Sequence, residues 1–310
     1  MPMRALLVHN PTSGSGRPSD KALLAALDEA GFSTSYYSTK DDAYKSALSQ
    51  SADIVIIAGG DGTVGKVTRR ISDRNTLVGI LPIGTANNVA RCMGIFGEPE
   101  QLIAGLRGAP VKRLDMGIAA GPWGTRHFLE SVGWGAFAEA VTPDGEREAP
   151  KEERIQKGRR VFAETLGKAT PKHFTVTADG NEIEEDFIFV EVLNLGMTGP
   201  RMLISPSAET GDQLLDVVYL TAARRQDMID WLESGDHERP PPVQVCKARK
   251  VTFHWDEGPL RVDDNVFSEP ELPSNIILEL ERESLRICVP PGPEEHPAET
   301  ESQPSAAEAS

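Results

Sequence analysis

Short apolar runs, each followed by a turn that contains glycine or proline, recur through the first third of the chain. Residues 5–8, 54–57 and 77–82 are mostly apolar and have the length of buried strands. Segments with helical spacing lie between them, and the first of these helices is predicted to begin at a Ser19 cap. Strands that alternate with helices imply a parallel sheet covered on both faces. We therefore predict an α/β domain over residues 1–113.

From residue 114 onward, strands follow one another without regular helices between them. The predicted strands are 128–132, 173–178, 187–193, 215–220, 250–254 and 276–280. This pattern is typical of an antiparallel β-sandwich, with one helical interruption at 152–167. We predict a second, β-rich domain for substrate or metal over 114–272, and a returning segment at 273–289 that completes the first domain.

Charge and composition narrow the class of protein. The 310 residues are 39% hydrophobic and carry a net charge of −15, which fits a soluble globular protein. Nucleic acid is excluded as the main partner, and so is permanent docking on an anionic membrane, because both need an excess of lysine and arginine. The final segment, 290–310, has five glutamates and no lysine or arginine, and we predict that it is disordered.

The sparse cysteines indicate a reducing compartment, and the N-terminal segment does not have the length of a signal peptide. Cys92, Cys246 and Cys288 show no metal or redox spacing. The apolar start of the chain is too short for a signal peptide, and no run is long enough to span a bilayer. We expect a cytoplasmic protein, with transient visits to a membrane surface. A homodimer is compatible with this organisation.

The turns after the three apolar runs have the chemistry of a phosphate site. Glycine lets backbone N–H groups approach an anion, and the start of a helix adds further N–H donors and a positive dipole end. Thr12, Ser13, Thr63 and Thr85 add hydroxyl donors. Asp61 would repel a phosphate, so it fits a helix cap, a metal ligand or a ribose contact. Ordinary strand-to-helix turns use the same residue types, and this reading stays open.

These turns and their order resemble the diacylglycerol kinase catalytic-domain family, which also includes sphingosine and ceramide kinases. The matching segments are Asn-Pro-Thr-Ser-Gly at 10–14, Gly-Gly-Asp-Gly-Thr at 59–63, Pro-Ile-Gly-Thr-Ala-Asn-Asn-Val-Ala-Arg at 82–91, Leu-Asp-Met-Gly at 114–117 and Gly-Asp-Gln-Leu-Leu-Asp-Val-Val at 211–218. NAD kinases and phosphofructokinase-like proteins share similar glycine turns. The second turn and the 211–218 segment favour the lipid kinases.

The resemblance implies a nucleotide-binding α/β domain, a β-sandwich, and ATP and Mg²⁺ in the cleft between them. The residues it matches to nucleotide binding are Asn10, Pro11, Thr12, Ser13, Gly14, Gly59, Gly60, Asp61, Gly62, Thr63, Val64, Gly65, Gly84, Thr85, Asn87 and Asn88, with Thr39 as a further candidate. The family's structural magnesium site corresponds to the Asp212 carboxylate and the carbonyls of Leu215 and Val217.

Several positions depart from the family pattern. Asn88 stands where the family has Asp, Gln213 where it has Gly, and Gly65-Lys66 where it has Asn-Glu. The family's Asp-Gly-Glu, which ends in the residue taken as the general base, corresponds to Asp263-Asp264-Asn265. Asparagine cannot accept the proton of an attacking hydroxyl. Asp264 or Asp263 could replace it, and only one of them would face the cleft because neighbouring strand residues point to opposite sides. A solvated hairpin turn remains an equal alternative.

Three functions follow from these observations. The leading hypothesis is an ATP- and Mg²⁺-dependent lipid kinase that phosphorylates a hydroxyl of diacylglycerol or a related lipid, with Asp264 as the base. A second is a nucleotide-binding regulator with the kinase fold and weak catalysis, because Asn88 and Asn265 are amides. A third is a kinase for a soluble alcohol, which a polar cleft would favour.

Overall fold

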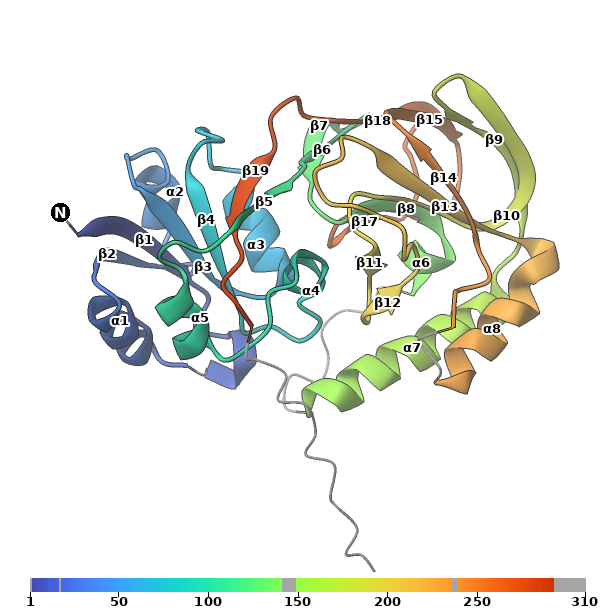
Figure 1. The fold of residues 1–310 in the computed structure, drawn as a ribbon. Coiled ribbons are helices and arrows are strands. Elements are labelled where there is room, and N and C mark those ends of the chain that lie inside the picture. Colours follow the sequence, from blue (N-terminus) through green and yellow to red (C-terminus); the bar gives the residue numbers. More distant parts are fainter. Residues whose placement is uncertain (1, 17, 141–148, 236–238, 293–310) are drawn as a thin grey trace, which may run out of the picture.

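Two lobes, each built on its own sheet, lie side by side in the computed structural model, which describes residues 2–16, 18–140, 149–235 and 239–292 (Figure 1). The first sheet has the order β2-β1-β3-β4-β19-β5. Its strands are β1 (Met3–His9), β2 (Phe32–Ser38), β3 (Ile54–Gly59), β4 (Leu77–Pro82), β5 (Val111–Leu114) and β19 (Leu285–Cys288). Only the β19–β5 pair is antiparallel, so the predicted parallel α/β architecture is confirmed as a mixed sheet.

Helices cover both faces of this sheet. They are η1 (Ser13–Gly16), α1 (Asp20–Glu29), α2 (Ala43–Ala47), α3 (Asp61–Thr68), α4 (Asn88–Met93) and α5 (Pro99–Gly105). The chain moves from β1 to β2 in one direction and through β3 to β4 in the other. Right-handed crossovers therefore place α1 on one face and α2 and α3 on the opposite face. Ser19 caps α1 as predicted, since its Oγ accepts a hydrogen bond from the Ala22 N–H at 3.2 Å.

The strand order brings three turns to one edge of the first sheet. Strands β1, β3 and β4 are adjacent and parallel, so their carboxyl ends lie together. The order reverses at β1, which lies between β2 and β3. Open α/β sheets bind ligands in the crevice outside the carboxyl ends at such a reversal. The fold thus positions a binding site before any side chain is considered.

The second lobe is an antiparallel sheet that curls on itself. Its strands are β6 (Gly117–Gly121), β7 (Gly124–Phe128), β8 (Ser131–Gly135), β9 (Lys172–Ala178), β10 (Asn181–Leu193), β13 (Leu215–Thr221), β14 (Gln244–Ala248), β15 (Lys250–Trp255), β16 (Leu260–Val262), β17 (Asn265–Phe267) and β18 (Ser274–Leu280). The two ends of the sheet meet through side chains: Trp123, in the turn between β6 and β7, stacks on Phe267 of β17 with ring centroids 4.5 Å apart. Buried apolar residues such as Phe128 and Trp255 fill the interior. The predicted antiparallel β architecture is confirmed.

Helices α6 (Ala136–Glu139), α7 (Lys151–Lys168) and α8 (Arg225–Ser234) and the short η2 (Ala222–Arg224) belong to the second lobe. α7 and α8 pack against each other along its outer side (Figure 1). Phe162 of α7 and Trp231 of α8 are buried in a core of their own. The predicted helix at 152–167 is therefore confirmed. A two-strand hairpin, β11 (Met197–Thr198) and β12 (Met202–Leu203), projects from this lobe toward the first.

The prediction of one continuous strand over 128–132 was wrong. β7 ends at Phe128 and β8 begins at Ser131. The backbone N–H groups of Leu129 and Glu130 donate instead to the Asp263 carboxylate, at 2.9 Å each. A side chain distant in sequence thus satisfies the donors that a strand would have used for its ladder.

The last part of the chain divides between the two sheets. Within 273–289, Ser274–Leu280 belongs to the second sheet and Leu285–Cys288 to the first. The predicted disordered tail, 290–310, lies outside the described residues apart from 290–292. Among the described residues, no helix combines the length and apolar character needed to cross a bilayer.

Candidate functional site

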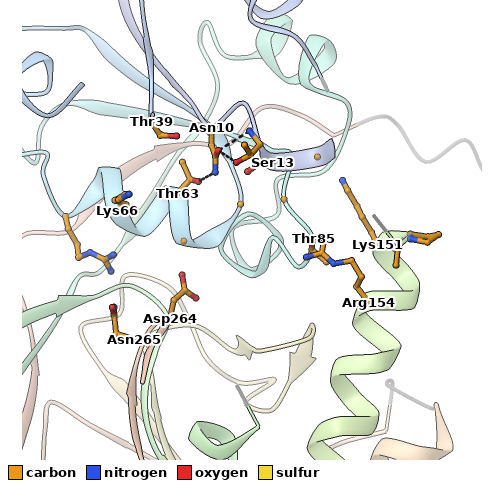
Figure 2. Close-up of a pocket in the computed structure, with 18 residues that line it drawn as sticks. Asn10, Ser13, Thr39, Thr63, Lys66, Thr85, Lys151, Arg154, Asp264 and Asn265 are labelled. Carbon is orange, nitrogen blue, oxygen red and sulfur yellow. Dashed lines mark hydrogen bonds between the residues drawn. The ribbon is translucent and has the colours of Figure 1, made fainter. Parts of the chain in front are cut away.

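A cavity of about 690 Å³ opens between the lobes at the carboxyl edge of the first sheet (Figure 2). It is lined by Asn10, Thr12, Ser13, Gly14, Thr39, Gly60, Gly62, Thr63, Lys66, Arg69, Gly84, Thr85, Ala149, Pro150, Lys151, Arg154, Asp264 and Asn265. The three predicted turns and Thr39 therefore meet in one place. The predicted residues that lie outside this lining are Pro11, Gly59, Asp61, Val64, Gly65, Asn87, Asn88 and Asp263, together with the three matched to the metal site, Asp212, Leu215 and Val217.

Hydrogen bonds join the first turn to helix α3. Asn10 Nδ2 donates to Thr63 Oγ1 at 3.0 Å, and Asn10 Oδ1 accepts from the hydroxyl of Thr12 at 2.8 Å. The Asn10 N–H donates to the Ala58 carbonyl at 2.9 Å, which fixes the turn against β3. Figure 2 shows Asn10 and Thr63 side by side on the wall of the cavity. These contacts pre-order the wall.

The turns after β3 and β4 are packed backbone against backbone. A Cβ on Gly84 would overlap the Cα of Gly60, so position 84 needs glycine, and a Cβ on Gly60 would lie tightly against Gly84 at 3.1 Å. Asn87 has φ 55° and locks the second turn: its Oδ1 accepts from the Gly84 N–H at 2.9 Å and its Nδ2 donates to the Pro82 carbonyl at 2.9 Å. Asn87 thus shapes the cavity from behind.

Asp61 acts as a cap within the first lobe. Its Oδ1 accepts a hydrogen bond from the Val89 N–H in α4 at 2.9 Å, which ties α3 to α4. Burial raises the pKa of the Asp61 carboxyl, while the hydrogen bonds it accepts from the Val89 and Asn88 N–H groups lower it. Of the three roles predicted for Asp61, the geometry corresponds to the helix cap.

Four basic side chains line the cavity, and the sequence did not identify them as a site. Lys66 lies on α3 and Arg69 directly follows that helix, whereas Lys151 and Arg154 lie on the first turn of α7. Asp264 is the only carboxylate among the described lining residues, so the cavity is basic in a chain of net charge −15. The i,i+3 spacing of each pair was visible in the sequence, but the approach of α7 to the first lobe was not.

The turn between β16 and β17 directs the side chains of Asp263 and Asp264 into different surroundings. Asp263 is buried, accepts the N–H groups of Leu129 and Glu130, and forms an ion pair with Arg69 Nη1 at 2.6 Å. Asp264 instead lines the cavity, where a Cβ on Gly62 would overlap its carboxylate. Only Asp264 of this pair is therefore placed to meet a ligand, and Asn265 lies beside it in the lining.

Two family models match successive parts of the chain. Residues 4–119 match the diacylglycerol kinase catalytic domain, and residues 152–289 match the YegS C-terminal NAD kinase beta sandwich-like domain. The predicted resemblance to the diacylglycerol kinase catalytic-domain family is confirmed over residues 4–119.

Proteins named diacylglycerol kinase align along most of the chain. A protein named diacylglycerol kinase from Bacillus subtilis (strain 168) is 25% identical over 272 residues, which cover 82% of this chain and 86% of the relative. One from Staphylococcus aureus (strain JH9) is 26% identical over 301 residues, or 91% of each chain. A crystal structure of a diacylglycerol kinase from Bacillus anthracis str. Sterne has a TM-score of 0.69 at 21% identity, covering 93% of this chain and 98% of its own. At 21% identity, the similarity to this crystal structure shows a common fold.

Asn88, which stands where the family has Asp, contacts the buried carboxyl group of Glu130, a residue that was not predicted from the sequence. Asn88 Nδ2 donates to Glu130 Oε2 at 3.2 Å and to the Gly199 carbonyl at 3.0 Å. Burial, together with the nearby carboxylates of Asp61 and Asp264, raises the pKa of Glu130 well above its usual range. Asn88 Oδ1 is buried without a hydrogen-bond partner among the described residues. Glu130 was not predicted as a site residue because it was assigned to a regular strand at 128–132.

The magnesium role of the residues matched to the family's structural metal site stays a prediction, and the structure shows their present contacts. Asp212 Oδ2 forms an ion pair with Lys247 Nζ at 2.9 Å, and its Oδ1 accepts the Leu214 N–H at 3.0 Å. Val217 lies in β13 between two paired strands, so its carbonyl faces a ladder partner. Among the described residues, no three His, Cys, Asp or Glu side chains are grouped to hold a metal ion.

Proposed function

We propose that this protein is a kinase that transfers the γ-phosphate of ATP, bound as its magnesium complex, to a hydroxyl of diacylglycerol or a related lipid. The convergence of three glycine-containing turns and four basic side chains on one cavity, opposite Asp264, carries the proposal. The match of residues 4–119 to the diacylglycerol kinase catalytic domain and the names of the relatives support it.

In the proposed reaction, the turns and the basic groups hold the phosphates while Asp264 acts on the acceptor. Backbone N–H groups near Gly60 and Gly84 and the hydroxyl of Thr85 donate to phosphate oxygens. Lys66 and Lys151 offset the negative charge from opposite sides. Asp264 takes the proton of the acceptor hydroxyl as its oxygen attacks the γ-phosphorus, and ADP leaves with the electrons of the broken P–O bond.

The polarity of the cavity favours a second candidate, a kinase for a soluble alcohol. Apart from glycines, Ala149 and Pro150 are the apolar members of the described lining. Such a cavity suits a small polar alcohol, or a lipid whose hydroxyl enters while its acyl chains stay outside in a membrane. The lipid form of the proposal therefore requires transient contact of a cytoplasmic protein with a bilayer.

One assay tests the proposal and separates the candidates. Purified protein is incubated with γ-labelled ATP and Mg²⁺, with either diacylglycerol in vesicles or a panel of soluble polyols as acceptor. We expect label in the lipid fraction, and a loss of about 10²–10⁴-fold in rate for Asp264→Asn. Asp256→Asn, at an exposed carboxylate outside the cavity, is the matched control.

Two outcomes would contradict parts of the proposal. Label in a polyol but not in lipid would select the soluble alcohol kinase. Binding of ATP without labelled product on any acceptor would support the regulator suggested by the amides at Asn88 and Asn265. An Asp264→Asn variant with unchanged rate would remove Asp264 from the role of base.

A further inference from the structure

The turn between β11 and β12 contains a residue in an unusual backbone conformation. Arg201 has φ 54°, in the left-handed region that glycine occupies freely and a long side chain rarely adopts. A non-glycine residue persists there when its surroundings compensate for the strain. The contacts of the Arg201 side chain, which glycine could not make, therefore compensate for its backbone conformation.

The guanidinium of Arg201 reaches across to the first lobe and to helix α7. Its Nη2 donates to the Thr85 carbonyl at 2.8 Å and its Nε to the Ala86 carbonyl at 3.1 Å. Its Nη1 forms an ion pair with Glu152 Oε1 at 2.5 Å. The Arg201 side chain is only 15% exposed. One planar group thus joins the turn after β4 to the first turn of α7.

The turn that carries Arg201 is itself held from both sides. Arg159 of α7 donates through Nε to the Pro200 carbonyl at 3.1 Å and through Nη2 to the Arg201 carbonyl at 2.9 Å. Asn88 Nδ2 of the first lobe donates to the Gly199 carbonyl at 3.0 Å. The backbone of the turn is therefore positioned independently of the Arg201 side chain.

Both segments that Arg201 joins contribute to the cavity. Thr85 lines it from the first lobe, and Lys151 and Arg154 line it from α7, on either side of Glu152. We propose that Arg201 is a positioning residue for this cavity: it holds the turn at 84–87 and the first turn of α7 in register, so that phosphate-binding groups from the two lobes meet on one ligand. The inference rests on the proposed nucleotide site.

Arginine suits this task better than lysine or glycine. Its rigid fork has five N–H donors and can serve two carbonyls and a carboxylate at once, whereas an ammonium on a flexible stem is a point charge. Glycine would relieve the backbone strain and remove all three contacts. Arg201→Gly therefore separates the two explanations: a purely structural turn tolerates it or gains from it, whereas a positioning residue does not.

The test compares wild type, Arg201→Gly and Arg201→Lys as full-length proteins. Hydrogen exchange without ligand is measured at residues 84–88 and 151–155, and MgATP affinity by calorimetry. We expect faster exchange at both segments in Arg201→Gly and about tenfold weaker binding of MgATP, with an intermediate effect in Arg201→Lys. Gln213→Gly is the control, because Gln213 also has a positive φ, 61°, but lies outside the cavity lining.

Each result decides the inference. Unchanged exchange at 84–88 and 151–155 in folded Arg201→Gly would overturn it, whatever the affinity, and so would equal loss of affinity in Gln213→Gly. If wild type does not bind MgATP, the proposed function fails, and the exchange measurement still decides whether Arg201 couples the two segments.

Discussion

Asp263 and Asp264 are neighbours in sequence with opposite surroundings. The Asp263 carboxylate is buried among backbone donors and the Arg69 guanidinium, whereas Asp264 lines the cavity. A buried acceptor whose hydrogen bonds are satisfied contributes to stability, and a carboxylate in a cavity can take part in chemistry. The two residues should therefore respond to substitution in different assays.

Asp263→Asn should lower the free energy of unfolding by about 2–3 kcal/mol. The substitution leaves the Arg69 guanidinium, whose side chain is 24% exposed, without its ion-pair partner. It also replaces one carboxylate oxygen with an NH₂ group, which cannot accept a hydrogen bond from the backbone N–H groups. Urea unfolding of the two proteins measures the difference. Asp256→Asn, which loses only a surface contact with Lys172, should cost less than about 1 kcal/mol. Equal losses in both variants would contradict the structural role of Asp263.

Glu130 should make stability fall as pH rises. Its folded-state pKa lies above the ordinary value of 4.5, so the folded protein binds the extra proton in the window between the two values. The protonated Glu130 carboxyl stabilises the folded protein fully at low pH. As the pH rises from the unfolded-state pKa to the folded-state pKa, the free energy of unfolding falls by up to about 1.4 kcal/mol per pH unit. Glu130→Gln cannot ionise. Its stability relative to wild type should increase from pH 5 to pH 8 in urea unfolding, and a constant difference would refute the shift.

At the level of elements, the first residues of α3 show why particular glycines are needed. Gly62 and Gly65 both lie in this helix, where alanine would normally stabilise by about 0.5–1 kcal/mol. A Cβ on Gly62 would overlap the Asp264 carboxylate, whereas one on Gly65 would meet the Arg69 guanidinium at 3.3 Å, which a shift of a few tenths of an ångström relieves. The helix and the opposing β16–β17 turn are therefore fitted to each other.

Gly62→Ala should slow phosphoryl transfer by at least about tenfold, because it displaces Asp264 from its position over α3. Gly65→Ala should keep the wild-type rate and unfold at the same or slightly higher temperature. The labelled-ATP assay and thermal unfolding are run on both variants. If Gly62→Ala turns over like wild type, the close approach of Asp264 has no catalytic consequence.

The sequence predicted those elements whose signals are local. The turns at 10–14, 59–63 and 84–88 follow short apolar runs, and parallel pairing brings their strand ends together. The break at Leu129 could not be predicted, because the acceptor Asp263 is 134 residues away in sequence. Lys151 was missed for the same reason: the helix was predicted, but its contact with the first lobe is tertiary.

At the level of the whole molecule, the lobes meet through side chains that also shape the cavity. Arg69 pairs with Asp263, Asn88 bonds the Gly199 carbonyl, and Arg74 pairs with Glu281 at 2.7 Å. The lining itself draws on both lobes. A ligand that bridges this cavity should therefore stabilise the two lobes together, since it binds only the folded arrangement.

Binding of MgATP should make this coupling measurable. At about 100 times its dissociation constant, a ligand adds about 2.7 kcal/mol to the free energy of unfolding. Lys151→Ala/Arg154→Ala removes the basic groups that the second lobe contributes, so at the same concentration the gain should fall to about 1 kcal/mol or less. Arg160→Ala, an exposed basic residue of α7 outside the cavity, is the control and should keep the full gain. Thermal unfolding with and without MgATP gives all three values. An equal gain in every protein would mean that the nucleotide contacts the first lobe alone, and that α7 takes no part in holding its phosphates.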